Sequence, residues 1–183
     1  MSLKDKTAAI LLAPRGSEDS EFHTPQKALE EAGVRVVVVG LEEGEGQTFK
    51  NDLDPVARYN VDKVASEAAA EDYDLLIIPG GTVGADKFRS EAAAIALTNA
   101  FGEAGKPVAA ICHAPWLLIE AGLVEGRRLT SFKSLRTDLE NAGGIWVDAA
   151  VVEDGGVITS RGPDDLPDFI EALVRALSDT AKQ

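Results

Sequence analysis

The run of valines from Val34 to Val39, interrupted only by Arg35, constrains the fold more than any other stretch of the sequence. A continuous β-branched run of this length is typical of a strand buried on both faces, as in a parallel sheet that helices cover on both sides. Further strands are predicted at Thr7–Ala13, Tyr73–Ile78 and Val108–Ile111. The sequence therefore predicts a buried sheet that needs two layers of helices.

Helical segments alternate with these strands. They are predicted at Glu21–Ala32, Ser90–Ala104, Pro115–Ala121, Leu135–Ala142 and Asp164–Leu177. Ser90 is the expected N-terminal cap of its helix, and Gly33 and Gly122 are typical helix stops. Strand and helix alternation of this kind predicts a doubly wound α/β fold with a mostly parallel sheet.

Three segments fit the alternation less simply. Val147–Val152 and Val157–Ser160 flank the turn sequence Glu153-Asp154-Gly155-Gly156, which favours a small antiparallel hairpin. Leu129–Phe132 is strand-like. Thr48–Leu53 indicates either a short excursion or a hairpin, with no legible function. Because no segment has the composition of a linker, residues 1–183 are expected to form one domain.

Composition excludes several classes of function. The formal charge of −13, from 31 acidic and 18 basic residues, repels phosphate backbones, so nucleic-acid binding is not expected. No apolar stretch approaches the roughly 20 residues that span a bilayer, and the charged N-terminus does not resemble a signal peptide. With one cysteine and two histidines, neither an intramolecular disulfide nor a Cys/His metal site is expected. A cytoplasmic location follows as the default.

Cys112, the only cysteine, follows the predicted strand Val108–Ile111 and precedes a helix that begins near Pro115. A sharp strand-to-helix turn exposes its central side chain, and the N-terminus of the helix favours thiolate over thiol. This is the arrangement of a nucleophile. The alternative is that Cys112 is a small buried hydrophobic residue, as many free cysteines are.

Two other strand ends carry groups that suit a nucleophile. Glu18 follows the first strand, and its carboxyl could share a proton with the thiol, or it could simply complement a helix N-terminus. Gly80 and Gly81 follow another strand, where their N–H groups could hold an oxyanion, or they could form only a turn. Ligands of doubly wound sheets gather at the carboxyl ends of the strands, so Cys112, Gly80 and Glu18 are expected to face one crevice.

The two histidines differ in their candidacy as a base. Adjacent residues on a tight turn point apart, so His113 reaches the sulfur of Cys112 only if the turn folds its ring back or a neighbouring subunit orients it. His23 lies in a predicted helix and is expected at the surface or an interface. Asp86 could orient a histidine as the third member of a triad. The aspartates that the sequence leaves equally open are Asp72, Asp74 and Asp138.

Longer motifs indicate a family resemblance. In chain order they are Ser17–Glu21, Leu75–Gly81, Lys106–Pro115, Gly126–Ser131, Asn141–Gly143 with Trp146–Asp148, and Thr159–Leu166. With these motifs, of which Ala-Ile-Cys-His-Ala-Pro is the most specific, the chain resembles the PfpI-like intracellular protease family. The same superfamily includes the parkinsonism-associated deglycase.

The resemblance implies a flavodoxin-like sandwich with Cys112 as the nucleophile on a strained elbow. It makes Glu18 the protonated partner of the sulfur and places His113 beside the thiol. Asp86 falls where the family carries the acid of a triad, which an adjacent subunit contributes in PfpI-like oligomers, although one extra residue precedes it. Backbone N–H groups around Gly81 and His113 would form the oxyanion site.

The same resemblance implies a stress-response protein that needs no cofactor and forms a homodimer or a larger homo-oligomer. Its cysteine would attack small carbonyl compounds, as in a glyoxalase or deglycase, or protein and peptide substrates, as in a cysteine peptidase. The alternative is a redox-sensing or chaperone-like protein whose Cys112 is oxidised and not turned over.

Overall fold

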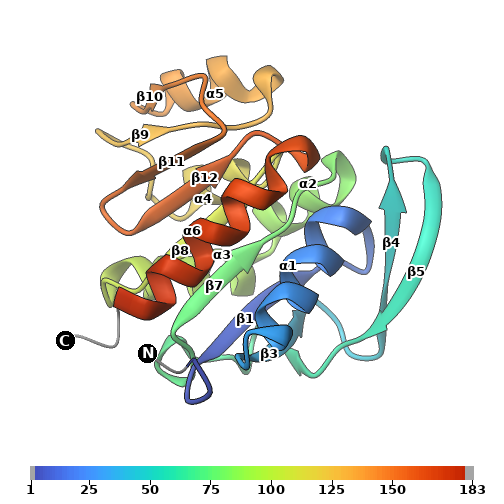
Figure 1. Cartoon of the computed structure of the whole chain (residues 1–183). Helices are drawn as coiled ribbons and strands as arrows, with labels where there is room; N and C mark the ends of the chain where they lie inside the picture. Colours follow the sequence, from blue (N-terminus) through green and yellow to red (C-terminus); the bar gives the residue numbers. More distant parts are fainter. Residues whose placement is uncertain (1–2, 180–183) are drawn as a thin grey trace.

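The computed structural model describes residues 3–179, and within them the main sheet has the strand order β11-β12-β8-β7-β1-β3-β6 (Figure 1). The bounds are β1 Thr7–Leu12, β3 Arg35–Gly40, β6 Lys63–Val64, β7 Leu75–Ile78, β8 Val108–Ile111, β11 Val151–Asp154 and β12 Val157–Ser160. Neighbouring strands run parallel except β11 and β12, which form the antiparallel hairpin. The predicted flavodoxin-like doubly wound α/β class is confirmed.

Helices cover both faces of this sheet. On one face lie α1 (Asp19–Glu31) and α6 (Leu166–Asp179), in front of the sheet in Figure 1. On the other lie α2 (Thr82–Ser90), α3 (Ala92–Glu103) and α4 (Pro115–Glu120). Side chains of a strand alternate between the two faces. In β1, Ile10 packs with Phe22 and Phe169 of the first pair of helices, whereas Leu11 packs with Phe101 of the second group.

The remaining elements lie at the periphery. They are β9 (Arg128–Leu129), β10 (Ile145–Trp146), α5 (Arg136–Asn141) and the short 3₁₀ helices at Ala70–Asp72, Lys133–Leu135 and Pro163–Asp165. The strands predicted at Leu129–Phe132 and Val147–Val152 are therefore shorter or shifted. None of the helices within residues 3–179 is long and apolar enough to traverse a bilayer.

The N-terminal cap predicted at Ser90 is wrong. Ser90 is the last residue of α2, an additional helix, and its hydroxyl donates to the Lys87 carbonyl, while Glu91 precedes α3. The sequence concealed α2 because Gly81 and Gly84 interrupt the local pattern. Both glycines allow α2 to approach β2 (Arg15–Glu18) closely: a Cβ on Gly81 would lie 2.1 Å from the Gly16 carbonyl oxygen.

The segment of undecided structure around Thr48–Leu53 is a hairpin. Strand β4 (Glu45–Lys50) pairs with β5 (Asp54–Asn60), and β2 completes this second sheet, which lies beside α1 in Figure 1. Its tip is formed by Asn51 and Asp52 with φ of 53° and 64°. The Leu53 N–H donates to the Lys50 carbonyl. Two left-handed residues closed by this bond make a type I′ turn.

The two-faced core leads to a stability prediction. Leu173→Ala on α6 removes a fully buried side chain and is expected to lower the free energy of unfolding by about 2–5 kcal/mol. Leu53→Ala is the matched control, because its side chain is 82% exposed, and it is expected to change that free energy by less than about 0.5 kcal/mol. Urea unfolding of both variants measures the difference; equal effects would contradict the packing described here.

Candidate active site

Cys112 sits at the end of β8 in a left-handed backbone conformation with φ of 64°. Its N–H donates to the Ser160 carbonyl and its own carbonyl accepts from the Phe132 N–H, so both neighbouring segments hold the turn in place. A non-glycine residue in this region costs roughly 1–2 kcal/mol and commonly marks a functional site. The residue as a whole retains 7% exposure, so the site is nearly but not fully enclosed.

The carboxyl beside this sulfur belongs to Glu21, in the first turn of α1. Glu21 is fully buried. Its Oε2 accepts the Gly80 N–H at 2.8 Å, its carboxyl interacts with the Cys112 side chain, and Oε1 has no regular hydrogen-bond partner among residues 3–179. Burial, reinforced by the negative charge of Glu18, raises the pKa of Glu21 to about 8. Glu21 is therefore neutral at pH 7 and has a proton to donate.

The structure corrects the assignment of Glu18 as the partner of the sulfur. The Glu18 carboxyl turns outward and accepts the Asn51 N–H at 3.0 Å, which ties the hairpin tip to the end of β2. Burial raises the pKa of Glu18 as well. The missed signal is periodic: Glu21 stands four residues before Pro25 and eight before Leu29, all on the buried face of α1.

The His113 ring folds back over the sulfur. Its Nδ1 lies 3.2 Å from the Cys112 Sγ. The ring stacks on Phe132 at 4.8 Å between centroids, and Trp116 lies beside it at 5.4 Å. Burial lowers the pKa of His113, although the charge of Asp52 opposes the shift. A neutral imidazole in this place can accept the thiol proton.

The pKa of Cys112 depends on the state of its neighbours. Burial raises it, and an ionised Glu21 raises it further, whereas the N–H groups of Gly81 and His113 point at the sulfur and lower it. While Glu21 is neutral, its charge no longer opposes the thiolate, and its O–H can donate to the sulfur. The two side chains thus oppose each other's ionisation, and the site tolerates at most one negative charge on them.

The predicted oxyanion donors divide into two groups. The N–H groups of Gly81 and His113 are close to the sulfur and can serve an oxygen bound next to it. The Gly80 N–H is already bonded to Glu21, so the structure does not support Gly80 as a donor to substrate. Gly80 is instead a point of close approach, because a Cβ there would lie 2.6 Å from the Glu21 Oε2.

The predicted triad acid, Asp86, is exposed on α2. Within one chain, the polar side chains near the Nε2 of His113 are Thr82 at 3.5 Å and Ser134 at 3.4 Å. A role for Asp86 across a subunit interface therefore stays a prediction. His23 is exposed on α1, as predicted, and its ring stacks on Tyr59 at 6.0 Å between centroids.

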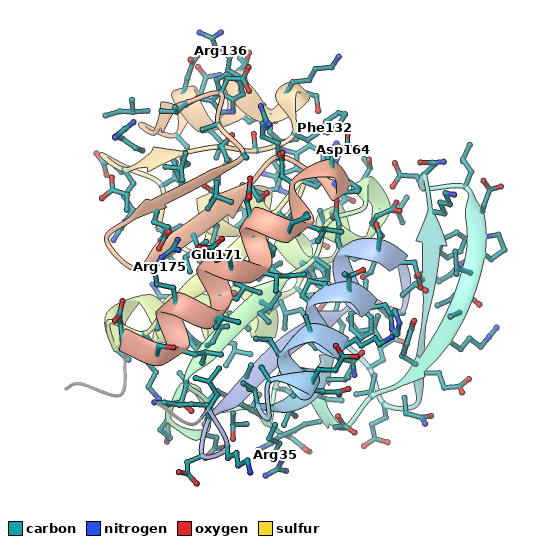
Figure 2. The ribbon with its side chains drawn as sticks, in the orientation of Figure 1. Arg35, Phe132, Arg136, Asp164, Glu171 and Arg175 are labelled. Atoms are coloured by element: carbon teal, nitrogen blue, oxygen red, sulfur yellow. The ribbon has the colours of Figure 1, made fainter. Side chains whose placement is uncertain are left out.

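A surface hollow of about 320 Å³ borders the site at Phe132. Its lining residues are Ser131, Phe132, Lys133, Trp146, Asp148, Arg161 and Gly162–Asp165. Figure 2 shows Phe132 and Asp164 close together at the end of the molecule where α6 begins. Among residues 3–179, no three His, Cys, Asp or Glu side chains are grouped to hold a metal ion.

Comparison with known proteins places this geometry in a family. Residues 6–176 match the model of the DJ-1/PfpI family. A Bacillus subtilis protein named "Putative cysteine protease YraA" is 42% identical over 164 residues, which cover 90% of this chain and 94% of that protein. The Thermococcus kodakarensis protein "Deglycase TK1284" is 38% identical over 168 residues, 92% and 98% of the two chains.

A solved structure gives the same result for the fold. The two-domain protein from Anabaena variabilis with DJ-1/ThiJ/PfpI-like and ferritin-like domains superposes with a TM-score of 0.88 at 36% identity. The match covers 95% of this chain and 48% of that one. The chain thus spans about half the length of that two-domain protein.

The roles of the two glutamates can be separated by alkylation of Cys112. At pH 9 an ionised Glu21 raises the pKa of Cys112, so Glu21→Gln is expected to speed iodoacetamide labelling at that pH. Glu18→Gln, the matched control, is expected to change the rate less than twofold. Identical pH profiles for wild type and Glu21→Gln would refute the coupling.

Glu21 also predicts a pH dependence of stability. The folded carboxyl keeps its proton to about pH 8, whereas the unfolded one releases it near 4.5. The contribution of the protonated Glu21 to the free energy of unfolding is therefore complete below pH 4.5. It is lost as the pH rises to 8, by up to about 1.4 kcal/mol for each pH unit. Relative to Glu21→Gln, the wild type should lose unfolding free energy in urea between pH 5 and 8. A constant difference would contradict the raised pKa.

Proposed function

Because the chain belongs to the DJ-1/PfpI family, we propose that it is an enzyme whose Cys112 attacks carbonyl carbons. One observation carries the proposal: on a left-handed residue at a strand end, the sulfur has the Nδ1 of His113 at 3.2 Å and the buried Glu21 carboxyl beside it. A base and a neutral acid on one thiol are what nucleophilic addition to a carbonyl needs.

For a 2-oxoaldehyde such as methylglyoxal, the steps follow from these groups. As the sulfur forms its bond to the aldehyde carbon, the thiol proton passes to His113 and the carbonyl oxygen becomes an oxyanion near the Gly81 and His113 N–H groups. Protonation of that oxygen gives a hemithioacetal. His113 or Glu21 then moves a proton from the aldehyde carbon to the adjacent carbon, while the hydroxyl proton of the hemithioacetal passes to the ketone oxygen. This isomerisation leaves the thioester of a 2-hydroxy acid. Water hydrolyses it to a hydroxy acid, so no cofactor is required.

Access favours small carbonyl groups over the backbone of a folded protein. With 7% of Cys112 exposed, an aldehyde or a carbonyl adduct at the end of a side chain reaches the sulfur more easily than a peptide bond does. Deglycase activity fits this access, and TK1284 carries that name. Peptidase activity, indicated by the name of YraA, is the second candidate, and the hollow beside Phe132 is the surface on which a peptide could lie.

A redox-sensing role is the alternative from a different class. The donors that surround the sulfur, the N–H groups of Gly81 and His113 and the neutral Glu21 carboxyl, would equally stabilise the oxygens of a sulfinate. In that case mild peroxide adds two oxygen atoms to Cys112 and no substrate is turned over. An intact-protein mass that is unchanged by peroxide, while carbonyl turnover persists, would exclude this role.

The test of the proposed enzyme is a substrate panel with wild type and Cys112→Ser. Consumption of methylglyoxal with release of lactate is expected from the wild type and should fall by about a thousandfold or more in the variant, since loss of a nucleophile has effects of that size. Release of intact amine from methylglyoxal-modified lysine or arginine would identify a deglycase. Cleavage of casein or a fluorogenic peptide would identify a peptidase.

The control is the stability of the variant, because serine replaces cysteine at a left-handed position. If Cys112→Ser unfolds at the same urea concentration as the wild type, its loss of activity is due to the loss of the nucleophile and not to unfolding. Wild-type protein that turns over none of the three substrates, while its Cys112 is oxidised cleanly, would replace the enzyme proposal by the redox one.

A further inference from the structure

The tip of the β4–β5 hairpin is linked to the catalytic histidine through α2. Asp52 Oδ1 accepts the Thr82 N–H at 2.6 Å, and Asp52 Oδ2 accepts the Thr82 hydroxyl at 2.8 Å. The Thr82 Oγ1 lies 3.5 Å from the Nε2 of His113, whose Nδ1 lies 3.2 Å from the Cys112 sulfur. A line of contacts therefore runs from Asp52 through Thr82 and His113 to Cys112.

The chemistry of these groups fixes the direction of each hydrogen. A carboxylate only accepts hydrogen bonds, so the single hydroxyl hydrogen of Thr82 is committed to Asp52, the closer and charged partner. Thr82 can then only accept from His113, so a hydrogen bond between them requires the ring hydrogen on Nε2. In a neutral imidazole the other nitrogen carries the lone pair, and that nitrogen, Nδ1, faces the sulfur.

The backbone at Asp52 supports a functional reason for its side chain. A type I′ turn favours glycine at its second central position, yet the sequence places Asp52 there with φ of 64°. The Glu18 carboxyl holds the same turn through the Asn51 N–H. A left-handed residue whose side chain reaches a catalytic histidine through one hydroxyl is kept there at some cost in turn stability.

We propose that Asp52 and Thr82 are positioning residues that fix the tautomer of His113, with the Nε2 hydrogen directed at Thr82 and the Nδ1 lone pair directed at Cys112. When the sulfur bonds to a carbonyl carbon, its proton moves to Nδ1, and the imidazolium keeps its Nε2 hydrogen on Thr82. No proton leaves Thr82 or Asp52. The inference rests on the proposed function for the use of this base, but it assigns the acid to the same chain, where Asp86 would require a second copy.

The tautomer can be measured without any substrate. The chain has two histidines, so ¹⁵N-labelled protein gives two sets of ring signals, and the His113→Gln variant identifies those of His113. At a pH where the ring is neutral, the wild type is expected to show hydrogen on Nε2. Hydrogen on Nδ1 in the wild type would overturn the proposal, whatever any variant does.

Variants at both positions test the contacts themselves. Thr82→Val keeps the shape and the backbone N–H but removes the hydroxyl, whereas Thr82→Ser retains it. Asp52→Asn keeps a side chain that tolerates the left-handed turn and removes the charge. Thr82→Val and Asp52→Asn are expected to slow iodoacetamide labelling of Cys112 at pH 7 at least about tenfold and to mix the tautomers; Thr82→Ser should stay within about twofold of wild type.

The titration of His113 supplies a readout that mere loss of packing would not move. The charged or ionisable side chains that act on the ring are Asp52 and Cys112. The Asp52 charge opposes the effect of burial, so Asp52→Asn is expected to lower the pKa of His113 further. The titration is measured by the NMR signals of the ring protons. An unchanged pKa in a folded Asp52→Asn protein would contradict the contact.

Two further variants decide between rival partners. If the acid comes from a second copy of the chain, Asp86→Asn slows iodoacetamide labelling of Cys112, whereas Thr82→Val and Asp52→Asn do not. If Ser134 is the acceptor of the ring hydrogen, Ser134→Ala changes the tautomer of His113 and the other variants do not. Either result overturns the proposal. Failure of the proposed function would give a different result. If carbonyl turnover is absent but the labelling and tautomer results are as expected, the positioning role of Asp52 and Thr82 stands. If turnover is unaffected by Thr82→Val, only that positioning role is refuted.

Discussion

The proton on the buried Glu21 carboxyl sets the electrical state of the active site. Burial raises the pKa of both Glu21 and Cys112, and a negative charge on either side chain makes a second one beside it costly. At neutral pH the proton that Glu21 keeps removes this opposition to a negative charge on the sulfur. His113 is kept neutral by the same burial and can take the thiol proton. The Gly80 N–H, given to Glu21, holds that carboxyl in place. Each of these effects would weaken in an open, wet cleft.

The parallel sheet makes this burial possible. The neighbouring parallel strands β7 and β8 end at the same edge of the sheet, and the segments that follow them carry Gly80 and Gly81 after β7 and Cys112 after β8. Helices α1 and α6 enclose the Glu21 side of that edge, while α2 begins on the other side with Thr82. Backbone N–H groups that follow the strands thus lie beside side chains from the first turns of the helices. The hydrogen-bonded strands of the sheet hold most of these groups in place.

Local sequence was sufficient to place Cys112 on a turn after a buried strand, but it did not identify the side chains around the sulfur. The bounds of β8, the turn at Cys112 and the antiparallel β11–β12 hairpin follow from a short apolar run, a proline and paired glycines, which act over a few residues. Glu18 was predicted because it follows the first strand and because the family resemblance implied it. The alignment of Glu21 with Pro25 and Leu29 on the buried face of α1 indicates the other glutamate. The hydrogen bond from Thr82 to Asp52 joins residues that are 30 positions apart in the sequence, so no local sequence pattern predicts it.

The close approach between α2 and β2 has a consequence for how such a site can diverge. Gly81 lies so near the Gly16 carbonyl oxygen that a methyl group at position 81 would displace the start of α2 from β2. The distances from Thr82 and Glu21 to the surroundings of the sulfur would then change. A residue without a side chain therefore limits how this contact can change, because even alanine at position 81 requires a shift of the backbone of α2 or β2.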